Sequence, residues 1–179
     1  NEEVIMSCPQ PRTHLPRETL VEVVRHTPLV SIDLICRDPQ GRVLLGWRSN
    51  RPAQASWFVP GGRILKDERI EQAIVRIAAA ELGLPAALAA QARPLGVYQH
   101  LYPDNFAGID ALTTHYVVLG WTLDLPAGEL QAADAQHREL RWFTPAELRS
   151  DPAVHPNTRA YFDASITAPR TAASAPAQA

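Results

Sequence analysis

Residues 61–84 read GGRILKDERIEQAIVRIAAAELGL and carry the strongest local pattern in the chain. The middle of this stretch is rich in Ala, Ile, Glu and Arg, and Gly83 followed by Pro85 is typical of a helix end. We therefore predict a helix over residues 68–82, preceded by a glycine loop. Such a helix projects Arg and Glu side chains at a fixed angle. The loop lets backbone carbonyls approach a hard cation such as Mg²⁺, which prefers oxygen ligands.

The segments around this helix alternate irregularly between strands and helices. Residues 29–37 and 42–47 are apolar runs separated by a turn with Pro39 and Gly41, which predicts a β-hairpin. A proline suited to a first turn, followed by apolar residues at helical spacing, predicts a short helix over residues 16–25. Further strands are predicted over residues 96–100, 114–123 and 139–143, with a short helix after Thr144-Pro145. This order favours an α/β (α+β) fold, with a mixed β-sheet sandwiched between helices.

Length and charge limit the class of protein. A chain of 179 residues with 46% hydrophobic residues suits one domain with a single core. A net charge of -2 provides no overall basic field, so we expect no nucleic-acid partner and no anionic membrane. The chain contains no apolar stretch of the ~20 residues needed to cross a bilayer. Cys8 and Cys36 are too few for a disulfide framework, so a reducing cytoplasm is the expected location, and Cys36 belongs to a predicted buried strand.

Composition also suggests the domain boundaries. Residues 1–16 contain several prolines and little periodic pattern, which indicates an irregular N-terminal arm. Residues 17–166 form the predicted domain. Residues 167–179 are almost all Ala, Thr, Pro, Ser and Gln and are expected to be a disordered tail, because they cannot bury enough apolar surface.

Within residues 61–84, Gly62 is followed after five residues by Glu68 and after seven more by Arg76, and the stretch ends with Glu81-Leu82-Gly83-Leu84. This spacing resembles the Nudix box, a loop-helix-loop that binds a divalent metal against a diphosphate, so the resemblance implies a Nudix fold. Ile77 and Ala80 stand where that family usually has glutamates. The loss of these carboxylates predicts a site for a single Mg²⁺ rather than for several ions.

The altered box and its flanking segments resemble the GDP-mannose mannosyl hydrolase family, from about residue 20 to about residue 162. The likeness is carried by TPLVS at 27–31, NRPAQ at 50–54, WFVPGGR at 57–63, TTHYVVLG at 113–120 and QH at 136–137. This resemblance implies a homodimer that hydrolyses GDP-mannose, with GDP-glucose as a second candidate substrate. In that family, water attacks the anomeric carbon of the sugar with inversion and GDP departs.

The resemblance also implies roles for individual residues. One Mg²⁺, for which Mn²⁺ can substitute, would be bound by the Gly61 carbonyl, Glu81 and Gln136. His137 would be the general base, and Arg48 would bind the departing diphosphate. The other catalytic residues would be Arg63 and Arg76. The substrate pocket would be lined by Arg48, Asp33, His100 and Tyr116, with His14, Leu15 and Leu20 near the base.

Physical reasoning supports a single general base. A nucleoside diphosphate whose charge is neutralised by Mg²⁺ and arginines is a weakly basic leaving group, so no acid is needed to protonate it. An ordinary histidine, with a pKa of about 6.5, can activate water at neutral pH, and His137 is the candidate.

Simpler interpretations remain open for several of these residues. Arg76 could pair with an Asp or Glu on its helix, and Gln136-His137 could be a solvated loop. Trp57, His100 and Tyr116 could be core residues, whereas Asp33 in an apolar strand needs a partner or a cavity. Two rival functions also remain. One is a Nudix pyrophosphatase that attacks phosphorus. The other is a non-catalytic nucleotide sensor, which is suggested by Ile77 and Ala80 in place of the usual glutamates.

Overall fold

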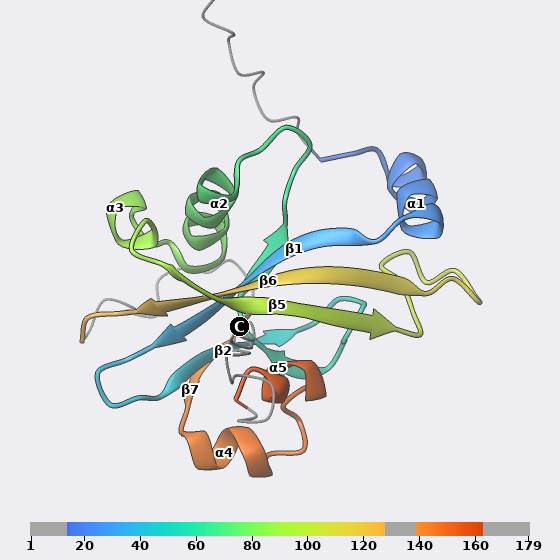
Figure 1. Cartoon of the computed structure of the whole chain (residues 1–179). Coiled ribbons are helices and arrows are strands. Elements are labelled where there is room, and N and C mark those ends of the chain that lie inside the picture. Colours follow the sequence, from blue (N-terminus) through green and yellow to red (C-terminus); the bar gives the residue numbers. More distant parts are fainter. Residues whose placement is uncertain (1–13, 128–138, 163–179) are drawn as a thin grey trace, which may run out of the picture.

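The computed structural model describes residues 14–127 and 139–162, which form a twisted sheet with helices on both faces (Figure 1). The strands are β1 (Leu29–Arg37), β2 (Val43–Arg48), β3 (Ser56–Phe58), β4 (Gly61–Arg63), β5 (Arg93–Tyr102), β6 (Thr114–Asp124) and β7 (Leu140–Phe143). The helices are α1 (Arg17–His26), α2 (Ile70–Leu82), α3 (Ala86–Ala89), α4 (Pro145–Ser150) and α5 (Pro156–Ala160).

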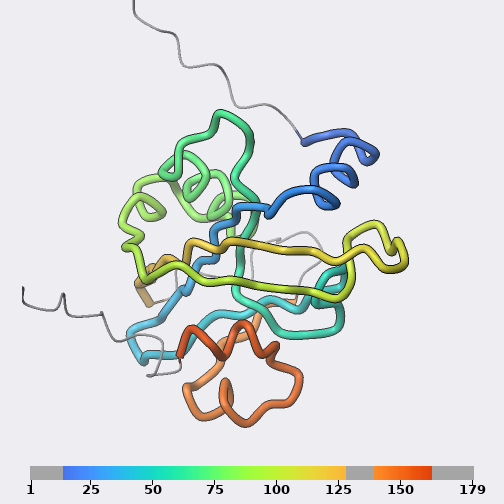
Figure 2. The backbone as a smooth tube through the Cα atoms, turned by 45° about the vertical axis from the view of Figure 1, so that its right-hand side comes forward, coloured from blue at the N-terminus to red at the C-terminus, as the bar shows by residue number. Residues whose placement is uncertain are grey.

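The sheet is mixed, as predicted. Five of its seven strands lie side by side in the order β3-β2-β1-β6-β5. Of the other two, β4 pairs with β1 and β7 pairs with β2. The β1–β6 pair is parallel, and the remaining pairs between these strands are antiparallel. In Figures 1 and 2, α1, α2 and α3 lie on one face of the sheet, and α4 and α5 lie on the other.

Most elements expected from the sequence are present. The predicted hairpin is confirmed by the antiparallel pair β1–β2, and the three later strands are confirmed as β5, β6 and β7. The short elements β3, β4, α3 and α5 were not predicted, because pieces of three to five residues leave too little periodic pattern to identify.

Helix α2 begins at Ile70, later than the predicted Glu68. The carboxylate of Glu68 accepts hydrogen bonds from the Leu65 backbone N–H at 2.9 Å and from Arg76, which keeps Glu68 in the loop. The helix ends as predicted at Gly83, which has a left-handed φ of 65° and donates its N–H to the carbonyls of the last turn.

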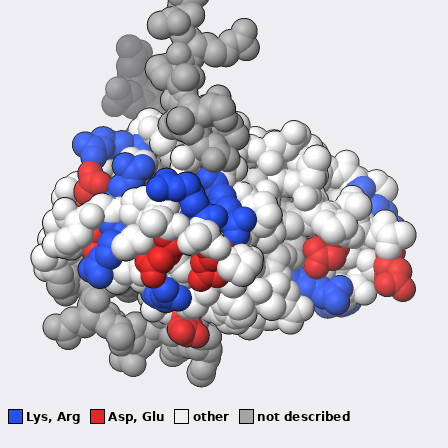
Figure 3. Space-filling view, turned by 90° about the horizontal axis from the view of Figure 1, so that it is seen from below, with Lys and Arg blue, Asp and Glu red and all other residues white. Residues whose placement is uncertain are grey.

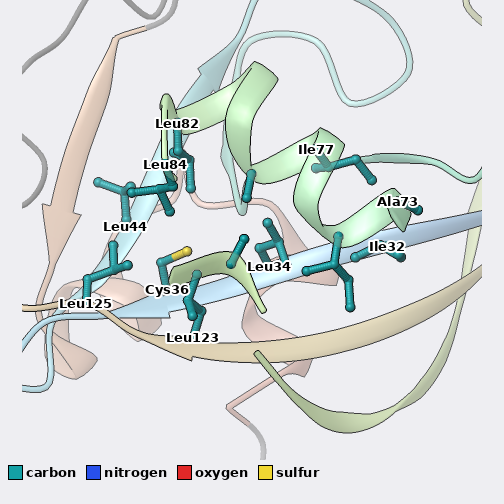
Figure 4. Close-up of a cluster of buried hydrophobic side chains, with 13 residues drawn as sticks. Ile32, Leu34, Cys36, Leu44, Ala73, Ile77, Leu82, Leu84, Leu123 and Leu125 are labelled. Atoms are coloured by element: carbon teal, nitrogen blue, oxygen red, sulfur yellow. The ribbon is translucent and has the colours of Figure 1, made fainter. Parts of the chain in front are cut away.

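The two sides of β1 face different environments. Ile32, Leu34 and Cys36 point toward α2 and join the cluster drawn in Figure 4. Cys36 is 0% exposed, which confirms the predicted buried strand. Because side chains alternate along a strand, Ser31 and Asp33 point to the opposite face, where α4 and α5 lie. Polar residues on this side of an otherwise apolar strand indicate a cavity.

The surface seen from below carries charges of both signs side by side (Figure 3). Among the described ion pairs, Arg141 of β7 pairs with Glu147 of α4 at 2.8 Å and lies 4.0 Å from Asp151. The described part of this face therefore lacks the uniformly basic surface that is typical of nucleic-acid binding.

Candidate active site

A cavity of about 170 Å³ opens beside Ser31 and Asp33. Its lining is mostly polar or aromatic and comprises Ser31, Asp33, Arg48, Pro52, Phe58, Gly61, Gly62, Arg63, His100, Tyr102 and Tyr116. These residues come from β1, β2, β3, β4, β5 and β6 and from the loop before β3. The structure thus brings together most of the expected pocket residues, including Asp33, Arg48, Arg63, His100 and Tyr116.

Gly61 lies against Asp33 because β4 pairs antiparallel with β1 and these two residues are opposite each other. A Cβ atom at position 61 would come within 2.5 Å of Asp33 Oδ1 and 2.6 Å of the Ile32 carbonyl oxygen. A side chain cannot fit there, so the site requires glycine for this close approach.

A second cavity, of about 150 Å³, adjoins the first and shares Arg48, Pro52, Arg63 and Tyr116 with it. Its remaining lining is largely apolar and consists of Leu20, Val24, Leu29, Arg51, Phe106 and Thr114. Two arginines therefore lie at the boundary between a polar cavity and a more apolar one. The guanidinium of Arg48 also lies 5.3 Å from the centre of the Phe58 ring.

A third, small cavity contains two of the three expected metal ligands. Gly61 and Glu81 both line it, together with Gly46, Trp47, Arg48, Phe58, Val59, Pro60 and Leu140. No group of three or more His, Cys, Asp or Glu side chains suited to a metal occurs among residues 14–127 and 139–162. The described oxygen donors, a carboxylate and a backbone carbonyl, fit the single Mg²⁺ expected from the sequence.

Arg76 is held beside the site rather than in it. Its guanidinium donates to both carboxylate oxygens of Glu68, at 2.6 and 2.8 Å, and to the Arg63 carbonyl oxygen at 2.8 Å. It is not among the lining residues of these three cavities. Arg76 does pair with an acid, but Glu68 lies in the loop before α2 rather than on the helix, and the hydrogen bond to the Arg63 carbonyl ties Arg76 to the end of β4.

Asp33 has the partner that its position in an apolar strand requires. It is 6% exposed, and Oδ2 accepts a hydrogen bond from the Tyr161 hydroxyl at 2.6 Å. Burial raises the pKa of Asp33 to about 7, although the Tyr161 hydrogen bond and the charge of Arg48 oppose this shift. Burial, with the nearby His155, lowers the pKa of His100 to about 4, so this imidazole is neutral at physiological pH.

Sequence reasoning missed several residues of the site. Ser31, Phe58 and Tyr102 line the first cavity, and Tyr161 lies behind it. Ser31 could have been found, because it shares a strand face with Asp33. Tyr161 follows a short helix, and its separation from Asp33 in sequence gives no local signal.

The remaining candidates are distributed as follows. Leu20 lines the second cavity, whereas His14 and Leu15 are exposed before α1 and are not among the lining residues of the three cavities. The expected metal ligand Gln136 and the expected base His137 lie outside the described residues. Trp57, left open between core and site, packs in a buried cluster with Phe143.

The chain belongs to the NUDIX domain family, whose pattern matches residues 27–164, and is a Nudix hydrolase. It is 36% identical to the low-salt glycan biosynthesis protein Agl8 of Haloferax volcanii. The matched region of 156 residues covers 87% of this chain and 93% of that protein.

Two solved structures have a similar fold. A MutT NUDIX hydrolase from Burkholderia pseudomallei matches with a TM-score of 0.58 and 28% identity, over 76% of this chain and 96% of that one. The NUDIX domain of Shewanella oneidensis NrtR in complex with ADP ribose matches with a TM-score of 0.53 over 72% of this chain and 80% of that one. Its 22% identity supports likeness of fold alone. In the described part of the chain, no helix is long and apolar enough to cross a membrane.

Proposed function

We propose that this Nudix hydrolase cleaves GDP-mannose, or GDP-glucose, to GDP and the free sugar with the aid of one Mg²⁺. The observation that carries the proposal is the order of the neighbouring cavities. An apolar cavity suits a nucleobase, Arg48 and Arg63 at its boundary suit a diphosphate, and the polar cavity with Asp33 and His100 suits sugar hydroxyls. A nucleoside diphosphate sugar has its parts in this order.

The metal would be held by the Glu81 carboxylate and the Gly61 carbonyl, with Gln136 as a further ligand. Bound Mg²⁺ would supply positive charge that stabilises the departing diphosphate. Arg48 lines both the metal cavity and the polar cavity, so its guanidinium can add to that charge from the protein side. Two sources of positive charge make protonation of GDP unnecessary.

His137 is the proposed general base for a water that attacks the anomeric carbon with inversion. Its place in the chain supports this role, because it precedes Leu140 by three residues and Leu140 lines the cavity of Gly61 and Glu81. The backbone is also fixed close to Arg48, since the Trp47 N–H donates to the Glu139 carbonyl at 2.9 Å. The likeness to a glycan biosynthesis protein is consistent with a substrate that contains a sugar.

Hydrolysis in ¹⁸O-labelled water tests the bond that is cleaved. We expect the label in the released sugar, with unlabelled GDP, and we expect NMR to detect first the anomer opposite to that of the substrate. Label in a phosphate would instead establish the rival function, attack on phosphorus. His137→Ala, whose turnover is expected to fall by about a hundredfold or more, is the control for background hydrolysis.

The non-catalytic rival makes a different prediction. A nucleotide sensor would bind GDP-sugars tightly but would release no product with Mg²⁺ across a panel of sugar nucleotides. The proposed homodimer is tested separately by light scattering of the full chain on a sizing column, where a monomer mass would contradict it.

A further inference from the structure

Tyr161 lies directly behind two polar residues of the first cavity. Its hydroxyl donates to Asp33 Oδ2 at 2.6 Å and lies 3.3 Å from Nε2 of His100. Asp33 and His100 line the cavity, whereas Tyr161 is 2% exposed and is not among the lining residues. The hydroxyl of Tyr161 can therefore affect a ligand in this cavity through Asp33 and His100, the two lining residues with which it forms hydrogen bonds.

The hydrogen bonds of Tyr161 determine which nitrogen of His100 carries the proton. A phenol hydroxyl has a single proton, and above pH 7, where Asp33 is mostly ionised, that proton is donated to Asp33. The phenol oxygen can then only accept from His100, which requires a hydrogen on Nε2. Because His100 is neutral, its Nδ1 keeps a lone pair and is a hydrogen-bond acceptor.

We propose that Tyr161 is a positioning residue for the sugar end of the site, where its hydroxyl selects the His100 tautomer and holds the Asp33 carboxylate. In this arrangement Asp33 and His100 both present acceptors, which suit the hydroxyl donors of a sugar. The inference rests on the proposed function, because that function places sugar hydroxyls against these two residues.

The surroundings of Tyr161 keep its ring in one orientation. The edge of the Tyr98 ring packs on it, with centroids 4.6 Å apart and an angle of 79° between the planes. The preceding segment is anchored to β3, since the Trp57 N–H donates to the Ala153 carbonyl and the His155 N–H donates to the Trp57 carbonyl. Burial and the nearby Asp33 raise the pKa of Tyr161 far above its usual range, so the hydroxyl remains a donor.

The test compares Tyr161→Phe with Tyr98→Phe in the full chain. The first change removes only the hydroxyl that contacts Asp33, and the second removes a hydroxyl from the ring packed against Tyr161. We expect Tyr161→Phe to lower kcat/KM for the sugar nucleotide by about tenfold or more, as for the loss of a hydrogen bond to a charged group. The inhibition constant of GDP, which lacks the sugar, should stay unchanged, and Tyr98→Phe should change neither quantity.

Nitrogen-15 NMR of histidine-labelled protein provides a second readout that does not require turnover. The signal of His100 is assigned by its loss in His100→Gln. We expect the Nε2–H tautomer in the wild type and a shift toward Nδ1–H, or a mixture, in Tyr161→Phe. Melting temperatures of both phenylalanine variants check that they fold.

Several outcomes would overturn the inference. One is an Nδ1–H tautomer in the wild type, which can be seen even if Tyr161→Phe does not fold. Others are an unchanged tautomer in the variant, an unchanged kcat/KM, or equal losses for sugar nucleotide and GDP, as expected of a merely structural residue. If the wild type releases no free sugar, the proposed function fails by itself, and NMR alone then decides the role of Tyr161.

Discussion

At the scale of single residues, the proposed reaction depends on the negative charge of Glu81, which binds Mg²⁺. Glu81→Gln replaces a charged oxygen ligand by a neutral one of the same size. We expect the Mg²⁺ concentration for half-maximal activity to rise by about tenfold or more, since even outer-sphere changes at metal sites have effects of this order. A Mg²⁺ titration of activity measures it. An unaltered requirement would remove Glu81 from the coordination sphere.

The proposed base, His137, should affect turnover rather than binding. His137→Ala removes the group that accepts a proton from water, so we expect kcat to fall by about a hundredfold or more with little change in KM. Steady-state kinetics at neutral pH measure this change. His115→Ala is a suitable control, because this histidine pairs with Gln99 on the surface and is not among the lining residues of the three cavities. Equal rates for wild type and His137→Ala would exclude His137 as the base.

At the scale of elements, the ion pair between Arg76 and Glu68 joins helix α2 to the preceding loop. The Glu68 side chain is 1% exposed, and the Arg76 hydrogen bond is the largest influence that holds the pKa of this carboxyl below its usual value of 4.5. Because the pKa of Glu68 is lower in the folded chain than in the unfolded chain, the ionised carboxylate stabilises the fold at any pH above its unfolded pKa. This stabilisation is lost as the pH falls through the folded pKa.

Arg76→Ala should therefore lower the free energy of unfolding at pH 7 by about 1–3 kcal/mol, because it leaves a buried carboxylate without its charged partner. Urea unfolding at pH 7 and at successively lower pH measures the effect. The difference between variant and wild type should shrink as the pH falls below about 4.5, where Glu68 in the unfolded chain is protonated. A difference that does not depend on pH would contradict this account of the ion pair.

Ile77 also acts at the element scale, because it packs α2 against β4. It is 2% exposed, and its Cγ1 lies 3.2 Å from the position of a Cβ atom on Gly62. Ile77→Ala should lower the free energy of unfolding by about 2–5 kcal/mol through the cavity that it leaves. Thermal or urea unfolding measures this loss. Ala80→Ser on the exposed side of the same helix is the control and should have little effect.

At the scale of the whole molecule, the C-terminal segment with α5 completes the site. Tyr161 and Val154 are both buried in the cluster between the sheet and this segment. A chain that ends at Ile166 should keep its melting temperature and activity, because the residues removed are those expected to be a tail. A chain that ends at His155 lacks Tyr161 and should unfold or lose activity. Calorimetry and an assay of both truncations check this, and equal losses in both would contradict the boundary at residue 166.

Much of the fold could be predicted from local sequence patterns. The apolar runs on either side of the Pro39-Gly41 turn predicted β1 and β2, and Gly83 correctly ended α2. Such patterns are informative because helix and strand periodicities reflect the preferences of neighbouring residues. The resemblance to a known family also named several of the residues that line the cavities, among them Arg48, Gly61 and Glu81.

Contacts between distant residues required the folded chain. Tyr161 reaches Asp33 across 128 positions of sequence, and Arg76 turns away from the cavities to Glu68. Strand order and the packing of α5 bring such residues together, and no local periodicity encodes either of them. The chain's own residue pattern therefore established the helix and the hairpin, and its resemblance to a known family supplied the candidate residues. Three-dimensional packing established which of them meet, because burial and pairing depend on neighbours that are remote along the chain.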